Sequence, residues 1–161
     1  MKATTLPGLT GEPALEMLHA APVRPSAPGT PRLLFVHGLG YAAWVWEGWM
    51  AAAAAAGHDS WAVSLRGHGG SGGTAARSAL SDYEADVVRA VRTHSDTSGL
   101  VVLTMHAGDD QIFAAMEAGA SGFVGKDSKA AEVVSAAKHA AVAPRTFLCA
   151  GLSAAMMRRA T

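Results

Sequence analysis

Cysteine is nearly absent from this sequence, and neither sign of charge is in excess. Cys149 is the single cysteine, so the chain can form no internal disulfide and has no second thiolate for a redox motif or a zinc site. Thirteen lysine and arginine residues balance thirteen aspartate and glutamate residues. Because no basic block is present that could neutralise a run of phosphates, we expect no nucleic-acid partner.

Long apolar runs are also missing, although half of the residues are hydrophobic. The alanine-rich run at 50–56 is far shorter than the roughly 20 residues that a membrane-spanning helix needs. The N-terminus has no basic segment leading into an apolar one, so no secretion signal is indicated. We therefore expect a cytoplasmic protein without a membrane partner, and 161 residues suffice for one globular domain.

Strand and helix patterns alternate along most of the chain. We expect strands at 32–38, 60–65, 100–105 and 121–126, and helices at 42–56, 82–92, 110–118 and 129–143. Ser81 and Glu84 have the spacing of a capping box, and Asp109 is placed to cap the third helix. Residues 1–31 hold six of the seven prolines and predict a loose arm with room for one edge strand. The alternation predicts an open, mostly parallel α/β sheet.

A glycine-rich loop contains a serine in a suggestive pattern. The segment "GHGGSGG" at 67–73 fits G-x-S-x-G, with Ser71 at the serine position. In serine hydrolases this pattern places a nucleophile on a sharp turn between a strand and a helix. His68 belongs to the same loop and could act with Ser71, but no acid has a spacing that identifies it as a partner. Because no strand directly precedes Ser71, we interpret it as a flexible loop residue.

Three stretches of the first half are similar to a known family. "LLFVHGLG" at 33–40, "RGHGGSG" at 66–72 and "SDYEADVVRAV" at 81–91 resemble the N-terminal part of the α/β-hydrolase fold. They match its strand with a His-Gly motif, the loop after its next strand, and the helix beyond. In that family the nucleophile lies one strand and helix later than this loop. The resemblance therefore argues against a catalytic Ser71.

The hydrolase resemblance implies roles for the His-Gly motif. Backbone amides near Leu39 and Gly40, which follow His37 and Gly38, correspond to those that bind an oxyanion. We interpret His37 as a structural histidine whose ring holds the loop by hydrogen bonds.

The second half resembles a different family. "GLVVLTMHAGDD" at 99–110 and "AGASGFVGKD" at 118–127 are similar to the C-terminal half of a response-regulator receiver domain. The resemblance implies that Thr104 is the receiver's switch hydroxyl and that Lys126 is its phosphate-pairing lysine.

The two resemblances together indicate one hybrid domain over residues 1–161. Its hydrolase-like half covers 1–93 and its receiver-like half covers 94–161. We expect a three-layer α/β/α, flavodoxin-like sheet with order 2-1-3-4, where strand 1 is the segment at 32–38. An antiparallel N-terminal strand is expected beside strand 2.

Each half lacks catalytic parts of the family that it resembles. The first has no nucleophile strand, and the second has no phosphoacceptor aspartate. We therefore expect a chimeric chain, engineered or of de novo type, that has no evolved catalytic activity and is not an enzyme. The alternatives are a residual esterase that uses Ser71 or a histidine, and a receiver-like dimerisation module.

Self-association is the one partner interaction that we expect. Side chains on the two halves were not selected together, so apolar surface should remain exposed and favour a homodimer or a larger assembly. The predicted interface residues are Phe113, Met116, Phe123, Val133 and Val134. No cofactor, metal or small-molecule substrate is indicated. Asp109 and Asp110 open a helix, and we interpret them as charges that favour its N-terminus rather than as magnesium ligands.

Overall fold

The fold is described from a computed structural model, which covers residues 1–105 and 108–160. The chain divides into two compact units, Met1–Ala79 and Leu80–Thr161. Each unit has its own β-sheet. The two units are described separately below.

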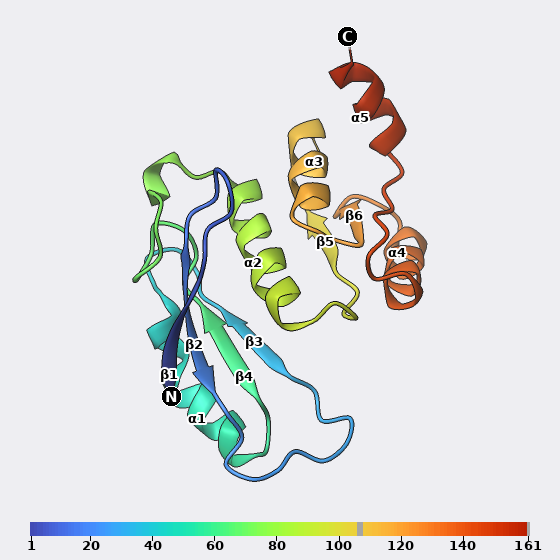
Figure 1. Cartoon of the computed structure of the whole chain (residues 1–161). Coiled ribbons are helices and arrows are strands. Elements are labelled where there is room, and N and C mark those ends of the chain that lie inside the picture. Colours follow the sequence, from blue (N-terminus) through green and yellow to red (C-terminus); the bar gives the residue numbers. More distant parts are fainter. Residues whose placement is uncertain (106–107, 161) are drawn as a thin grey trace. The chain divides into compact units, whose positions relative to one another are not determined.

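A four-stranded mixed sheet forms the first unit. Its strands are β1 (Lys2–Leu6), β2 (Leu15–Ala20), β3 (Leu33–Val36) and β4 (Ser60–Val63), in the spatial order β1-β2-β4-β3. The β1–β2 and β2–β4 pairs are antiparallel, and only the β3–β4 pair is parallel. The expected antiparallel N-terminal strand beside 60–65 is confirmed by β2 (Figure 1).

The loose arm expected at the N-terminus is instead a pair of strands. Leu15 and Met17 on β2 are buried, with 0% and 2% of their surface exposed, so this strand is part of the core. The outer strand β1 is largely exposed and pairs with β2 along its whole length, from Lys2 opposite His19 to Leu6 opposite Leu15. The prolines lie outside both strands, where they remove no hydrogen bond of the ladder.

The helix expected at 42–56 has two parts. A 3₁₀ turn, η1 (Ala43–Trp46), leads into α1 (Glu47–Ala55), and Gly57 follows at φ +93°, the left-handed conformation expected after a helix end. Met50 and Ala54 of α1 pack on Ala20 of β2 and Ala62 of β4. The helix therefore covers one face of the sheet. A second short 3₁₀ turn, η2 (Ala75–Arg77), ends the unit.

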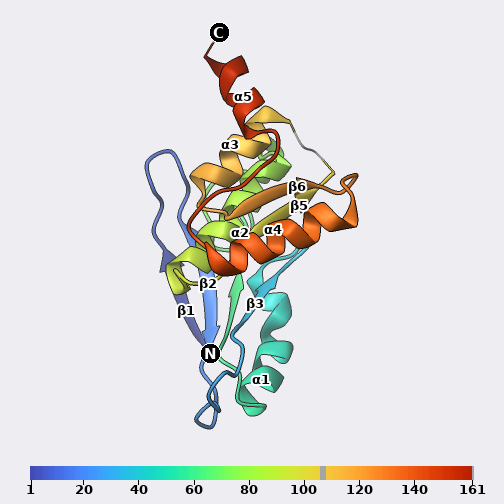
Figure 2. The ribbon, with the colours of Figure 1, turned by 90° about the vertical axis from the view of Figure 1, so that its right-hand side faces the viewer.

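The second unit alternates helices with two short parallel strands. Its elements are α2 (Leu80–His94), β5 (Val101–Thr104), α3 (Asp109–Glu117), β6 (Gly122–Gly125), α4 (Ala130–Val142) and α5 (Leu152–Arg159). Strands β5 and β6 pair in parallel, and Leu148 adds a parallel bridge beside Gly122. Figure 2 shows α4 in front of these two strands. The two strands and three helices expected between 82 and 143 are thus all present.

The hydrophobic core of the second unit joins α2, α3, β6 and α5. Its buried members are Val88, Ile112, Phe113, Ala115, Ala120, Phe123 and Ala155. Phe113 and Phe123 are 8% and 3% exposed, so these two side chains cannot line the self-association face that the sequence suggested. Their burial follows from the short sheet, which needs the apolar side chains of both strands and helices to exclude water.

The predicted strand order 2-1-3-4 is wrong. The chain forms two sheets: a mixed one in the first unit and a parallel pair in the second. In the first sheet the antiparallel β1–β2 pair extends the β4 edge, while β5 and β6 pair with each other. The structure is an α/β fold with open sheets, but it is not a mostly parallel, flavodoxin-like one.

Two predicted helix caps are also wrong. Helix α2 begins at Leu80, so Ser81 lies inside its first turn and does not cap it with Glu84. Helix α3 has Gly108 at its N-cap, and Asp109 is its first residue. An acid in that first turn still favours the helix dipole. Within the described residues no helix has the length and apolar character needed to cross a bilayer.

Candidate active site

The His-Gly loop begins where β3 ends. His37 is 4% exposed and uses both ring nitrogens: Nδ1–H donates to the Gly38 carbonyl at 2.8 Å, and Nε2 accepts from the Leu65 N–H at 2.9 Å. Since Leu65 follows β4, the ring joins the ends of the two parallel strands. This is the structural role interpreted from the sequence.

Burial is the main influence on the acidity of His37. It lowers the pKa of the imidazole below its ordinary value of 6.5, the hydrogen bond to Gly38 opposes this, and the nearby His68 adds a small lowering. The neutral ring is the form that can donate at Nδ1 and accept at Nε2 at once. His37 is therefore a fixed neutral support for the loop.

The loop that follows contains backbone donors without an acceptor in the described residues. Tyr41 N–H donates to the Gly38 carbonyl at 3.3 Å, closing a turn in which Gly40 has φ +82°. Within residues 1–105 and 108–160, the N–H groups of Leu39 and Gly40 have no hydrogen-bond acceptor. A methyl group built on Gly38 or Gly40 would meet no atom within 4 Å. Two amides are thus available to an oxygen atom from outside the chain.

Ser71 is hydrogen-bonded to the backbone of β2 and of the residue that follows β4. Its hydroxyl donates to the Ser64 carbonyl at 2.5 Å and accepts from the Glu16 N–H at 2.8 Å. Strand β4 ends at Val63, well before Ser71, so the residue does not sit on a turn between a strand and a helix. Because its proton is held by a carbonyl rather than by a base, the hydroxyl acts as a structural link.

Glu16 connects the two loops. Its Oε2 accepts from the Ser64 hydroxyl at 2.7 Å and from the Gly70 N–H at 3.0 Å, and Ser64 Oγ in turn accepts from the Ala43 N–H at 2.9 Å. Gly69 lies so close that a Cβ there would be 2.5 Å from Glu16 Oε2 and 2.9 Å from the Ala42 Cβ. The glycine-rich loop and the His-Gly loop are therefore held side by side.

Sequence reasoning missed both members of this connection. Glu16 lies on β2 and Ser64 follows β4, and only the antiparallel pairing of these strands brings them together. Neither residue belongs to a motif. The one available signal is Glu16 itself, a charged residue in the otherwise apolar run around β2.

His68 is the second histidine at this site. Its Nδ1–H donates to the Arg66 carbonyl at 3.0 Å, and its ring centre lies 5.0 Å from that of His37, tilted by 56°. Two imidazole rings therefore lie close together at this site.

The two candidate residues of the second unit lie together. Thr104 ends β5 and is 4% exposed, and Lys126 directly follows β6 and is exposed. The Lys126 N–H donates to the Thr104 carbonyl at 2.8 Å. Because β5 and β6 are parallel, both residues lie at the carboxyl ends of the two strands, on the same side of this sheet.

Asp109 is engaged by an arginine. Both of its carboxylate oxygens accept from Arg158, each at 2.7 Å, and the hydrogen bond to Arg158 lowers the pKa of the carboxyl group. In the described part of the chain, no group of three or more metal-ligating side chains comes together. Cys149 is a free, half-buried thiol.

Comparison with known proteins relates the chain to one family. Residues 33–159 match the model of the alpha/beta hydrolase family. No curated protein matches the chain significantly.

Several solved structures are similar at low identity. A deformylase from Pseudomonas putida S16 is 20% identical over 77% of this chain and 46% of its own, with a TM-score of 0.49. A thioesterase domain from a curacin biosynthetic pathway is 19% identical over 99% and 62%, with a TM-score of 0.48. Epoxide hydrolase A from Mycobacterium thermoresistibile is 16% identical over 77% and 38%, with a TM-score of 0.48. This chain spans less than two thirds of the length of each.

The family match overturns two expectations from the sequence. It extends from the first hydrolase motif through most of the segment assigned to a receiver. The expectation of a chain that is not an enzyme and has no evolved catalytic activity is therefore wrong. The match favours the alternative of a residual hydrolase.

Proposed function

Because this chain belongs to the alpha/beta hydrolase family, we propose that it hydrolyses carboxylic esters where its His-Gly loop meets its glycine-rich loop. The observation that carries the proposal is the pair of amides at Leu39 and Gly40, which have no acceptor among the described residues, in a loop that Glu16 and Ser64 hold next to the glycine-rich loop. The chain spans only part of the similar structures, so the proposal concerns activated esters, which need the least assistance.

The carbonyl oxygen of the ester binds at the two amides. Backbone donors that have no acceptor within the described part of the chain give up no such hydrogen bond when negative charge develops on that oxygen. His37 keeps them in place because its ring fixes the loop to the end of β4. Removing one such donor in an oxyanion site typically costs about 100-fold or more in rate.

His68 is the general base in this proposal. Its Nε2 accepts a proton from a water molecule as the water oxygen bonds to the carbonyl carbon. The resulting tetrahedral intermediate carries its negative charge on the former carbonyl oxygen. When the carbon–oxygen bond to the leaving alcohol breaks, the alcohol oxygen receives the proton from His68, and a carboxylic acid and an alcohol are released.

Ser71 has a supporting role. Its hydroxyl joins the Ser64 carbonyl to the Glu16 N–H and so positions the loop that carries His68. The alternative is that Ser71 is the nucleophile, which would require its proton to leave the Ser64 carbonyl for a base.

Initial rates of 4-nitrophenyl acetate hydrolysis test these assignments. We expect His68→Gln to lower kcat/KM by about tenfold or more, since a positioned base contributes on the order of 100-fold or more. His58→Gln is the matched control, because His58 precedes β4 whereas His68 follows it. If Ser71→Ala is inactive but as stable as wild type, Ser71 and not water is the nucleophile. Equal rates for all four proteins and for buffer would refute the hydrolase proposal.

We also infer that residues 94–161 are receiver-like and that the chain self-associates. The succession β5, α3, β6, α4 with parallel strands supports the receiver-like inference, as does the position of Thr104 and Lys126 at the carboxyl ends of the two strands.

Self-association is supported by exposed apolar side chains, among them Val134, Val142 and Met157, which are 51%, 86% and 70% exposed. Sedimentation at micromolar concentration should give at least a dimer, and a monomer would contradict it.

A further inference from the structure

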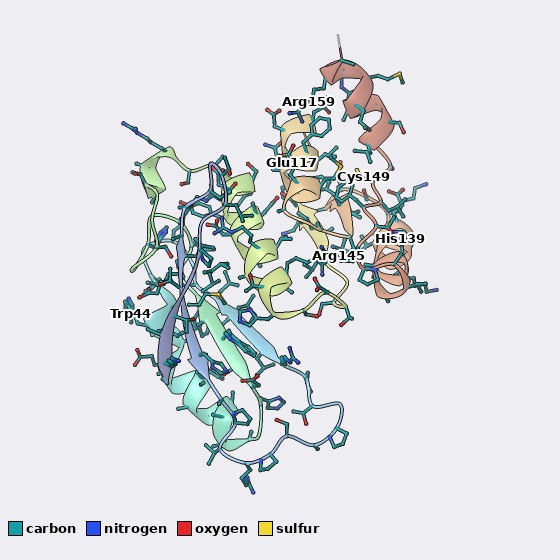
Figure 3. The ribbon with its side chains drawn as sticks, viewed as in Figure 1. Trp44, Glu117, His139, Arg145, Cys149 and Arg159 are labelled. Carbon is teal, nitrogen blue, oxygen red and sulfur yellow. The ribbon has the colours of Figure 1, made fainter. Side chains whose placement is uncertain are left out.

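Aromatic side chains beside the His-Gly loop suggest which esters this site accepts. Tyr41 directly follows Gly40, and Trp44 lies in the first turn of η1. They are 53% and 57% exposed, and their ring centres are 6.3 Å apart at an angle of 58°. Figure 3 labels Trp44 at the outer margin of the first unit.

Local geometry explains why the two rings lie together. Tyr41 lies just before η1 and Trp44 lies in its first turn, with the extended Ala42 and with Ala43 between them, so the contact joins the end of the His-Gly loop to the start of η1. The neighbouring Trp46 is different: it stacks on Phe35 at 5.3 Å and belongs to the core beneath α1. Tyr41 and Trp44 therefore have no such packing role.

The amides and the exposed rings are adjacent in sequence. Leu39 and Gly40, whose N–H groups have no acceptor in the described residues, directly precede Tyr41, and a Cβ on Gly38 or Gly40 would meet no atom beyond the neighbouring residues within 4 Å. The amides suit a negatively polarised oxygen, and the two rings suit an apolar ring that can stack on one aromatic face and meet the edge of the second.

We propose that this site selects esters and carboxylates whose acyl part carries an aromatic ring, with the carbonyl oxygen at Leu39 and Gly40 and the ring on Tyr41 and Trp44. The inference rests on the proposed function for the role of the amides. It adds the substrate class, which neither the family match nor the amides themselves define.

Ligand binding tests the inference without requiring turnover. Phenylacetate, which combines a carboxylate with an aromatic ring, is titrated into the full chain while the amide NMR shifts of Leu39 and Gly40 are followed, and acetate is titrated in parallel. We expect phenylacetate to bind at least about fivefold more tightly than acetate, because its ring adds aromatic contacts that acetate lacks. Equal binding, or no shift at these amides, would overturn the inference.

Variants locate the aromatic contribution. In the Tyr41→Ala/Trp44→Ala double variant we expect phenylacetate affinity to fall about fivefold and acetate affinity to stay the same. Trp49→Ala is the control, because Trp49 is 67% exposed but lies on α1. If circular dichroism shows that the double variant does not fold, the single Trp44→Ala variant replaces it. An unchanged phenylacetate affinity in a folded Trp44→Ala variant would contradict the proposal.

Hydrolysis separates this inference from the proposed function. The two test substrates are 4-nitrophenyl phenylacetate and 4-nitrophenyl acetate, which have the same leaving group and differ only in the acyl part. Their hydrolysis rates are compared. A preference for phenylacetate that disappears in the double variant supports both proposals. Specific binding of phenylacetate without hydrolysis of either ester would refute the hydrolase proposal and retain the aromatic site.

Discussion

His37 shows how a motif residue can be fixed by burial. Both of its ring nitrogens are hydrogen-bonded in the neutral form, and burial lowers the pKa of the imidazole below 6.5. The unfolded chain therefore binds more protons than the folded chain below about that pH, so the free energy of unfolding falls as the pH falls.

The pH dependence of stability tests this account of His37. We expect the free energy of unfolding to decrease once the pH drops through 6.5, by about 1.4 kcal/mol for each unit by which the folded-state pKa is lowered. The loss should end when the pH passes below the folded-state pKa. His37→Gln should show a smaller decrease than wild type in urea titrations. If the free energy of unfolding still falls with pH as in wild type in His37→Gln, but no longer does so in His139→Gln, the effect belongs to His139 and not to His37.

Arg92 has the corresponding structural role in the second unit. Its guanidinium donates to the carbonyls of Gly119, Ser98 and Pro144 at 2.8, 2.6 and 2.7 Å, and to the Ser121 hydroxyl at 3.1 Å. These groups belong to three separate turns, and burial is the main cause that lowers the pKa of Arg92. One side chain thus joins three turns, and the Pro144 carbonyl also accepts from the Ser121 hydroxyl at 2.5 Å.

Replacing Arg92 should be costly. We expect Arg92→Met to lower the free energy of unfolding by about 2–4 kcal/mol, because several partly buried hydrogen bonds, including those to the Gly119 and Ser98 carbonyls, are lost at once. Arg145→Met is the matched control: Arg145 is 59% exposed and pairs with Asp96 at the surface, so its loss should cost less than about 1 kcal/mol. Urea unfolding followed by circular dichroism measures both. Equal effects would show that Arg92 is not the link proposed.

Single residues of the site were predicted better than their partners. The sequence identified the His37 loop and doubted Ser71 because motif position and local patterning are local information. It could not identify Glu16 or Ser64, since their hydrogen bond depends on pairing between β2 and β4, which are distant in sequence. The Gly108 cap was missed for a different reason: helix ends are set by local hydrogen bonding that residue preferences define only to within a few positions.

At the level of elements, the βα alternation was predictable and the sheet partners were not. Apolar runs bounded by glycine define β3, β5 and β6, and periodicity defines the helices between them. The choice of neighbour depends on which edges remain available. The N-terminal strands extend the β4 edge of the first sheet, an outcome that their own composition does not specify.

Two interactions hold helix α5 in place: the burial of an apolar side chain and an ion pair at the surface. Ala155 is completely buried in the core of the second unit, whereas Arg158 binds Asp109 at the surface. Arg159 lies over the Phe113 ring at 4.6 Å. Exposed ion pairs contribute little because water and salt screen them. We therefore attribute the docking of α5 mainly to Ala155.

Hydrogen exchange distinguishes the two contributions. Ala155→Asp should increase exchange at the α5 amides by about tenfold or more, because it places an unpaired charge in the core. Arg158→Gln should leave their protection within about threefold of wild type. The opposite ranking would mean that the ion pair with Asp109, not burial, holds the helix.

For the whole molecule, the sequence predicts that residues 1–161 form one domain that unfolds in a single cooperative step. All four tryptophans lie in the first unit, at 44, 46, 49 and 61, while helices of both units contribute to circular dichroism. If the chain unfolds as one domain, as predicted, urea transitions by tryptophan fluorescence and by circular dichroism coincide. Separate midpoints would instead indicate two domains bounded near Ala79.

The oxyanion role of the His-Gly loop is most directly tested by kcat/KM for 4-nitrophenyl acetate in a matched pair of Leu39 variants. Leu39 is 77% exposed, and Leu39→Ala keeps its backbone N–H whereas Leu39→Pro removes it. We predict that Leu39→Ala retains wild-type activity and that Leu39→Pro loses about 100-fold, with both variants folded. Equal activity in the two variants would contradict the account.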